Sequence, residues 1–249
     1  MRTIATTAIL ALSVLATVTN ASFNPIDFVK NKFFAKKPSQ AEIAKNVAAG
    51  AWPDLEWPAD QMSHGVLYHW NETTKELVQF ANATVDTYVD VTHNREKVVT
   101  QMEIPNLGFA EVLTYIDINN HIAYQKIPKI EQCKTFAIPK EFNLTSFWVD
   151  VTNETSGTTT YQGVVSLPWV TDMTFHKFHI QSPYVNETIF FCTKCHKAKW
   201  VITDDQPNYV LNTPAGPVDR VYTDADFDGL TCTSLEAPVE LKKLSTHMF

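Results

Sequence analysis

The chain has 249 residues, of which 45% are hydrophobic and 19% are charged, and these proportions exclude a largely disordered protein. Its length suits one large domain or two small ones. The formal net charge of −7 makes the chain a poor match for proteins that bind nucleic acid by neutralising phosphates.

Residues 1–21 have the features of a secretory signal peptide. Arg2 supplies a positive charge, an apolar run follows, and the small residues Thr19 and Ala21 precede the cleavage expected before Ser22. The apolar run is shorter than the ~20 residues that a spanning helix needs. We therefore expect a soluble protein that is secreted or stays in the lumen of the secretory pathway.

Residues 22–60 are predicted to form an N-terminal helical arm. Its first part, 22–37, is basic and rich in Phe, which is typical either of a helix on a membrane surface or of a propeptide or strap packed on the domain. Ser39 and Glu42 form a capping box, which predicts a short helix over 40–49. If the chain contacts a membrane surface at all, we expect the arm to make that contact.

The chain from 61 to 240 is predicted to be one β domain, followed by a tail at 241–249. Runs rich in Val, Ile, Thr, Tyr and Phe alternate with turn residues, which is typical of strands. We expect strands near 65–70, 75–81, 85–91, 96–104, 109–118, 121–127, 145–151, 159–167, 173–181, 187–192 and 198–203. Asn119 and Asn120 are expected to make a two-residue hairpin turn, because Asn tolerates positive φ. So many antiparallel strands curl into a barrel or stack as two sheets.

Five N-x-[ST] triplets, besides one at the expected cleavage site, agree with the secretory route and predict N-linked glycans. Most of them lie at apparent turns, where a bulky glycan can be accommodated. The acceptor residues are Asn71, Asn82, Asn143, Asn153 and Asn186.

The four cysteines are Cys133, Cys192, Cys195 and Cys232, and an even count in a secreted chain predicts two disulfides. A bridge between Cys192 and Cys195 would close a very small loop. We therefore favour the two connectivities that join these residues to Cys133 and Cys232. The loops closed in this way would stabilise the fold by ~3–4 kcal/mol each.

Cys192, Cys195 and His196 also spell C-x-x-C-H, the attachment pattern of c-type haem. Haem would need a second axial ligand, and the secretory route of a glycoprotein is not where such haem is attached. A redox dithiol is disfavoured because no helix or βαβ pattern follows the motif. A zinc site could add His176 or His179, but an oxidising compartment argues against it.

Three carboxylates near the C-terminus begin like a calcium-binding loop. Asp224, Asp226 and Asp228 alternate and Gly229 follows, but the twelfth position of the loop holds Leu235 instead of a carboxylate. The run could still hold calcium in another geometry, although such runs are more often solvated turns. No motif of a serine hydrolase, a zinc protease or a nucleotide-binding loop is present, so we expect no enzyme and no cofactor other than calcium.

Two segments carry a resemblance to a known family. YIDINNHIAYQKIPKIEQC is a hairpin that leads into Cys133, and in the terminal FDGLTC the residues Phe227 and Asp228 precede Cys232. With the Trp-bearing strands and the sequons, these segments resemble the ependymin-related secreted glycoproteins over roughly residues 60–236. The chain departs from the family pattern by its close C-x-x-C pair and by having no cysteine in the first third of the mature chain.

The resemblance implies a mainly β fold like that of the bacterial LolA-type carriers, a curved half-barrel of two antiparallel sheets around a hydrophobic pocket. It also implies disulfides that include Cys133, Cys232 and one cysteine of the C-x-x-C pair, together with calcium binding and homodimers. The leading hypothesis is a secreted glycoprotein that binds a lipid or fatty acid between its sheets. Candidate pocket residues, chosen from strand centres, are Val112, Tyr115, Phe147, Trp148, Trp169, Phe175 and Phe178. The alternative is a matrix or adhesion glycoprotein with a filled interior that associates through calcium.

Overall fold

The computed structural model of the protein describes residues 52–104, 106–182, 185–203 and 207–232. The expected signal peptide, the expected helix over 40–49 and the tail at 241–249 lie outside the described residues. The described end of the expected arm, 52–60, contains no helix, and Glu56 forms an isolated bridge to Lys197.

The described strands form one antiparallel sheet in the order β6-β5-β4-β3-β2-β1-β11-β10-β9-β8-β7, and β12 pairs with β1 outside this order. The strands are β1 Gln61–Asn71, β2 Glu76–Asp90, β3 Arg95–Ile104, β4 Gly108–Asp117, β5 Ile122–Ile127, β6 Gln132–Ala137, β7 Thr159–Ser166, β8 Thr174–Gln181, β9 Asn186–Cys192, β10 Ala198–Thr203, β11 Tyr209–Asn212 and β12 Val218–Asp219. The helical elements are η1 Pro128–Ile130, α4 Leu144–Thr152 and η2 Asp224–Phe227. None of the described helices combines the length and the hydropathy needed to cross a membrane.

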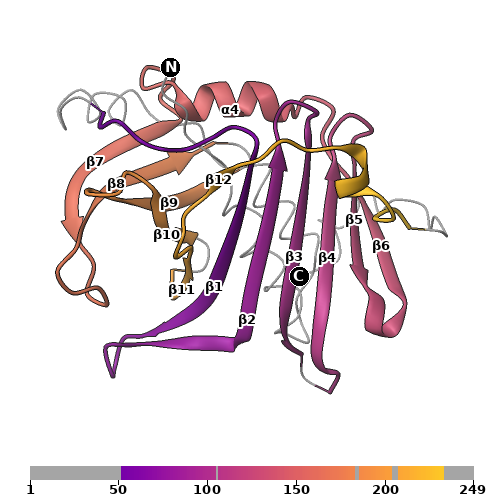
Figure 1. The fold of residues 1–249 in the computed structure, drawn as a ribbon, viewed down its shortest axis with the longest axis horizontal. Helices are drawn as coiled ribbons and strands as arrows, with labels where there is room; N and C mark the ends of the chain where they lie inside the picture. Colours follow the sequence, from indigo (N-terminus) through magenta and orange to yellow (C-terminus); the bar gives the residue numbers. More distant parts are fainter. Residues whose placement is uncertain (1–51, 105, 183–184, 204–206, 233–249) are drawn as a thin grey trace, which may run out of the picture.

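The chain builds this sheet in two halves that meet where β1 pairs with β11 (Figure 1). From β1, successive hairpins lead outwards to β6 at one edge. The segment that contains α4 carries the chain to β7 at the opposite edge, and further hairpins lead back to β11. The mainly β, antiparallel character expected from the sequence is confirmed. The strands nevertheless form one continuous, open sheet, so the expectation of two separate sheets is wrong.

The sheet curves around one large hydrophobic core. Val112 on β4 and Phe178 on β8 are far apart in the strand order, yet their buried side chains belong to the same cluster. The face that carries them is therefore the concave face. Buried residues of α4 and the rings of Trp52 and Trp57 complete this core.

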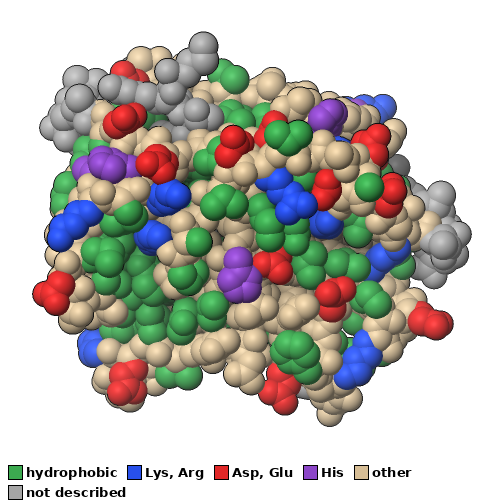
Figure 2. Space-filling model, viewed as in Figure 1, with side chains coloured by type: hydrophobic (Ala, Val, Ile, Leu, Met, Phe, Trp, Pro, Cys, Tyr) green, Lys and Arg blue, Asp and Glu red, His purple; other side chains and the backbone are tan. Residues whose placement is uncertain are grey.

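Two smaller clusters lie apart from the concave core. One contains Tyr115 and is covered by Tyr222, Phe227 and Leu230 of the segment 220–232, which we call the C-terminal strap. The other lies on β8 to β10 and under the β7–β8 loop, with Leu167, Phe175, Phe190 and Cys192 as its buried members. Figure 2 shows hydrophobic side chains gathered at the surface on the side of the molecule where β8 to β11 lie.

The strand expected over 145–151 is wrong, because these residues belong to α4. The Asn143 side chain accepts a hydrogen bond from the Ser146 N–H at 2.9 Å and caps the helix. The buried side chains follow helical spacing, at Leu144, Phe147, Trp148 and Val151. This spacing and the cap outweigh the strand preference of the Val, Phe and Thr residues in the segment.

Two further expectations need correction. The strands expected over 75–81 and 85–91 are one strand, β2, in which Ala81 and Asn82 adopt positive φ where the pairing with β1 shifts register. The hairpin between β4 and β5 exists, but its loop runs from 118 to 121, and the positive φ of 54° falls on His121.

The remaining expected strands overlap β1, β3, β4, β5, β7, β8, β9 and β10. Three strands were not anticipated, namely β6, β11 and β12. β11 and β12 have only four and two residues, so their alternation is too brief to stand out from the neighbouring loops. Length does not explain the omission of β6, because β5 and β10 have the same length of six residues and were expected.

Candidate functional site

Two rows of small side chains cross the concave face from β1 to β4. Within each row the residues are paired on neighbouring strands, so their side chains lie side by side on the same face. The first row is Gly65, Val85, Thr100 and Val112, and the second is Ser63, Thr87, Val98 and Thr114. All of them are buried. Side chains of this size occupy little of the space above a sheet, so the concave face of β2 to β4 is thinly covered at these positions, whereas Leu211 fills the space above Gly65.

Two hydroxyl groups in these rows lack hydrogen-bond partners. The Oγ1 atoms of Thr100 and Thr114 are buried and have no partner within the described structure. The indole N–H groups of Trp52 and Trp148, which belong to the same core, are also buried and have no hydrogen-bond partner within the described structure. A buried polar group without a partner costs ~1–3 kcal/mol, so native proteins rarely leave several of them in one core unless water or a ligand satisfies them.

The other half of the sheet contributes aromatic rings to the same core. Phe178 on β8 and Phe191 on β9 lie with their ring centroids 5.4 Å apart, edge to face. Trp57 lies 4.7 Å from Phe191 and 6.2 Å from Trp148 of α4. The concave face therefore combines a thinly covered wall of small side chains with an aromatic wall, which is a lining typical of sites for apolar ligands.

The structure does not bring the seven expected pocket residues together. Four of them lie in the concave core, at Val112, Phe147, Trp148 and Phe178. Tyr115 packs under the C-terminal strap, while Phe175 and the half-buried Trp169 belong to the cluster on β8 to β10. Successive side chains of a strand point to opposite faces of the sheet, so residues chosen only because they lie near the centre of a strand come from both faces.

A depression at the surface lies away from this lining. It has a volume of about 640 Å³, is open to solvent and lies between the segment before β1, Lys197 and the turn before β12. Its lining residues are Glu56, Trp57, Pro58, Ala59, Asp60, Lys197, Pro217, Val218 and Asp219. Of its lining residues, Trp57 belongs to the concave core and Ala59 packs against it, while the other lining residues lie outside that core.

The cysteine pairing differs from our expectation. Cys133 on β6 forms a disulfide with Cys232 in the C-terminal strap, whereas Cys192 and Cys195 are free thiols. The two favoured connectivities are therefore wrong. The strap crosses the sheet from β1 and reaches the edge at β6, which brings Cys232 to Cys133, far along the sheet from the β9–β10 turn.

The two free thiols face each other across the tight turn between β9 and β10. The Cys195 N–H donates to Cys192 Sγ at 3.0 Å, and the His196 N–H donates to the carbonyl of Cys192 at 2.8 Å. His196 has a φ of 57°, which lets the chain reverse here. Its Nδ1 lies 2.7 Å from the Asp54 carbonyl, so this ring is already engaged in holding the turn.

The environment separates the pKa values of the two thiols. Burial opposes ionisation of Cys192, but hydrogen bonds from the Cys195 thiol and from the N–H groups of Cys195 and Lys194, with the nearby Lys199, together lower its pKa. Burial and the hydrogen bond to Cys192 raise the pKa of Cys195. The pair is thus an asymmetric dithiol with one preferred thiolate.

The described residues around the turn do not gather into a cluster that could hold a metal ion. No group of three or more His, Cys, Asp or Glu side chains in the described ranges is arranged to hold a metal ion. His176, one of the histidines considered for zinc, has Nδ1 2.9 Å from the Tyr161 hydroxyl, and Tyr161 belongs to the concave core. The cysteines lie in the cluster outside that core.

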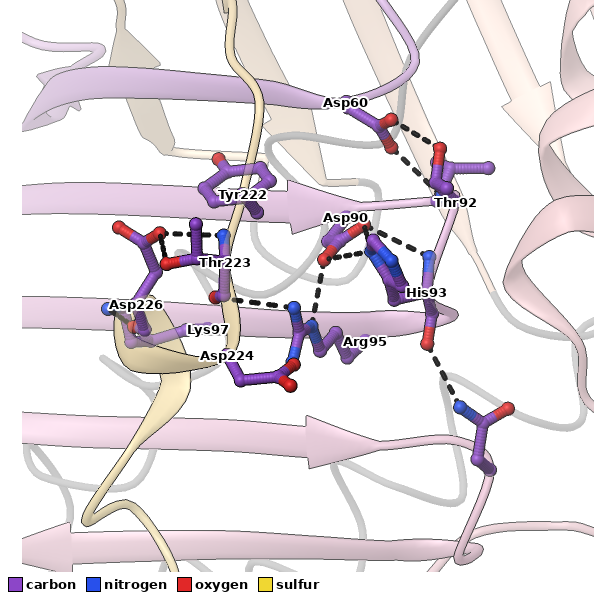
Figure 3. A network of polar contacts seen from close by, with 12 residues as sticks. Asp60, Asp90, Thr92, His93, Arg95, Lys97, Tyr222, Thr223, Asp224 and Asp226 are labelled. Carbon is purple, nitrogen blue, oxygen red and sulfur yellow. Dashed lines mark hydrogen bonds and ion pairs between the residues drawn. The ribbon is translucent and has the colours of Figure 1, made fainter.

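Two of the carboxylates considered for calcium are engaged in other contacts, since Asp224 joins the C-terminal strap to Arg95 of β3 and Asp226 bonds to residues within the strap (Figure 3). Asp224 accepts from Arg95 Nη1 at 2.8 Å, and Asp226 accepts from Arg220 Nη2 at 2.7 Å. Asp226 also accepts from the N–H of Thr223, and this hydrogen bond lowers the pKa of its carboxyl group. Asp228 is exposed just after η2. The structure does not bring the three carboxylates together.

The five sequons differ in accessibility. Asn82, Asn143 and Asn153 are exposed, whereas Asn71 and Asn186 are half-buried. Asn143 caps α4 through its Oδ1 atom, which leaves its Nδ2 atom uninvolved in the cap. The exposed residues meet the steric requirement for a glycan more fully than the half-buried ones.

Sequence reasoning missed the threonines of the concave rows. The alternation along β3 places Val98, Thr100 and Met102 on one face, and this signal is readable in the sequence. It does not tell which face becomes concave, because curvature depends on how distant strands meet. No known family model matches the chain, and no curated protein matches it in sequence.

Proposed function

We propose that the protein is a secreted carrier that holds an apolar ligand, such as a fatty acid or another lipid, against the concave face of its sheet. The observation that carries this proposal is the pair of unpartnered hydroxyls, Thr100 and Thr114, within rows of small side chains. A lipid would contact the valines and the aromatic wall through its chain. Its polar group would accept or donate hydrogen bonds at the two hydroxyls.

Several features support the same proposal. An open, curved antiparallel sheet agrees with the half-barrel that the resemblance to ependymin-related proteins implies. The Cys133–Cys232 disulfide agrees with a chain that matures in an oxidising compartment, and exposed sequons agree with glycosylation there. Removing apolar ligand surface from water contributes ~25 cal/mol per Å², so a single acyl chain suffices for useful affinity.

A ligand-bound concave face and a filled core respond differently to a larger side chain. We expect Val98→Phe to fold and to lose binding of a fluorescent fatty acid by at least tenfold, because the ring takes the place of the acyl chain. If residues of the protein itself fill the space, the same ring overpacks the core and lowers the free energy of unfolding by ~1–3 kcal/mol. Urea unfolding and fluorescence titration of the same preparation separate the two cases.

The threonines offer a second test with a matched control. Thr114→Val removes a hydroxyl on the concave face, and Thr84→Val makes the same change on the opposite face of β2. We expect only the first variant to change affinity for palmitate relative to a hydrocarbon probe without a carboxylate. Wild-type protein that carries no lipid on extraction and binds neither fatty acid nor phospholipid would refute the carrier function.

A further inference from the structure

The C-x-x-C turn between β9 and β10 has chemistry that ligand binding on the concave face does not use. Cys192 has an exposed fraction of 4%, whereas Cys195 is half-buried and therefore reachable from solvent. The Cys195 N–H donates to Cys192 Sγ at 3.0 Å, so the two cysteines lie next to each other across the turn. The strand pairing around the turn, the His196 contact to Asp54 and the bridge of Glu56 to Lys197 hold this arrangement.

We propose that Cys192 and Cys195 form a reversible dithiol–disulfide site that exchanges with low-molecular-weight disulfides. Cys195 is the sulfur that such a disulfide can reach, because Cys192 lies beneath it among Phe175 and Phe190. Cys192 is the resolving thiol, because it lies next to Cys195 across the turn.

The exchange proceeds in two thiol–disulfide exchange steps. Cys195 passes its proton to the Cys192 thiolate, and the Cys195 thiolate attacks one sulfur of the small disulfide, which breaks the S–S bond and releases a small thiolate that takes a proton from solvent. Cys192 then loses its proton to solvent, and its thiolate attacks the Cys195 sulfur of the mixed disulfide and releases the second small thiolate, which is also protonated by solvent. Two protein thiols are oxidised and one small disulfide is reduced to two thiols.

Hydrogen bonds to sulfur make this site reversible. The N–H groups of Lys194 and Cys195 point at Cys192 Sγ, and the N–H of Lys197 points at the Cys195 sulfur, so the reduced pair is already stabilised by the turn. Stabilising the reduced form makes the corresponding disulfide easier to reduce. The Cys133–Cys232 disulfide is different, since it spans a sequence separation of 99 and ties the strap to the sheet.

The test is equilibration of the full chain in buffers with different ratios of reduced to oxidised glutathione, followed by rapid alkylation and peptide mass analysis. We expect the peptide with Cys192 and Cys195 to pass from fully alkylated to fully bridged as oxidised glutathione increases, and to return when the ratio is reversed. The Cys133–Cys232 bridge should remain intact throughout and serves as the internal control. A pair that stays wholly reduced or wholly bridged at every ratio overturns the proposal, as does a stoichiometric zinc ion that prevents bridging.

Two variants test the assigned roles of the sulfurs. Cys192→Ala leaves the reachable thiol without its resolving partner, so we expect a stable mixed disulfide with glutathione at Cys195. Cys195→Ser leaves only the buried thiol, so we expect alkylation at Cys192 to be at least tenfold slower than at Cys195 in the other variant. Equal accumulation of the glutathione adduct in both variants would contradict the roles, and near-ultraviolet circular dichroism checks that each variant is folded.

Discussion

At the scale of single residues, Arg95 has two carboxylate partners in very different surroundings. Its Nε donates to Asp90 at 2.8 Å and its Nη1 donates to Asp224 at 2.8 Å, but the Asp90 side chain is 1% exposed and the Asp224 side chain 92% (Figure 3). We expect Asp90→Ala to lower the free energy of unfolding by ~3–5 kcal/mol, because it leaves the largely buried guanidinium without its buried partner. Urea unfolding measures this loss.

Asp224→Ala is the matched control, since it removes the exposed partner of the same guanidinium. We expect a loss of at most ~1 kcal/mol, which is typical of exposed ion pairs. Equal losses for the two variants would show that Arg95 is not anchored through Asp90.

Tyr115 gives the protein a dependence of stability on alkaline pH. Burial under the C-terminal strap, with the nearby Asp117, raises the pKa of Tyr115 from 10.0 to about 12. The folded protein therefore holds this proton more tightly than the unfolded chain does. The contribution to stability is fully present below pH 10 and is lost as the pH rises from 10 towards 12. We expect Tyr115→Phe to flatten the fall of unfolding free energy over this range, measured by urea unfolding at successive pH values.

Period-two alternation predicted which residues of a strand share a face, and it placed Tyr115 and Phe175 correctly at strand positions. It could not assign them to separate clusters, because Tyr115 acquires its environment from Tyr222 and Phe227, more than a hundred positions later. The cysteines show the same limit. Their number predicted bridges, but only the path of the strap determines that Cys232 reaches Cys133.

At the scale of elements, the C-terminal strap is held by one covalent bond, by packing on Tyr115 and by polar contacts such as that between Arg95 and Asp224. The Cys133–Cys232 disulfide joins residues with a sequence separation of 99, and a loop of that size is expected to contribute ~4–5 kcal/mol in the chain-entropy description. We expect Cys133→Ser with Cys232→Ser to lose ~2–5 kcal/mol and to speed hydrogen exchange in the strap first.

Cys195→Ser is the appropriate comparison for this double variant, because it removes a half-buried thiol outside the disulfide. We expect a loss below ~1 kcal/mol and no faster exchange in the strap. If the strap exchanges equally slowly with and without the disulfide, its noncovalent contacts, including the packing of Phe227 and Leu230, are sufficient to hold it.

Strands with long alternating patterns were predictable, whereas α4 was not. Its residues Phe147, Val149 and Val151 have strand propensity, and the helix follows from the Asn143 cap and from the burial of one face. Burial is a property of the finished fold, so local sequence favoured the wrong element here. β11 and β12 escaped detection for a simpler reason, since neither exceeds four residues.

At the scale of the whole molecule, the two halves of the sheet join where Gly65 of β1 lies beneath Leu211 of β11. A Cβ atom added at Gly65 would lie 2.7 Å from Leu211 Cδ1 and 3.3 Å from the Asn212 carbonyl oxygen. We expect Gly65→Ala to lower the free energy of unfolding by ~1–3 kcal/mol, because the buried Leu211 side chain has to shift to make room for the methyl group. Fluorescence and far-ultraviolet circular dichroism should still report one shared transition.

A double variant identifies the cause of that loss. Leu211→Val in the Gly65→Ala background should recover part of the stability, although Leu211→Val alone is destabilising. If the loss of unfolding free energy in the double variant equals the sum of the losses in the two single variants, the clash lies at the Asn212 carbonyl and not at Leu211.

The pairing of β1 with β11 also constrains how the protein is made. β1 is the first strand of the sheet to be synthesised, and its partner β11 follows only after the other nine strands of the series have been completed. During translation, β1 therefore exposes one row of backbone N–H and C=O groups that no earlier part of the sheet can cover. Contacts this distant in sequence slow folding, so we expect this edge of β1 to stay unpaired until β11 has been synthesised.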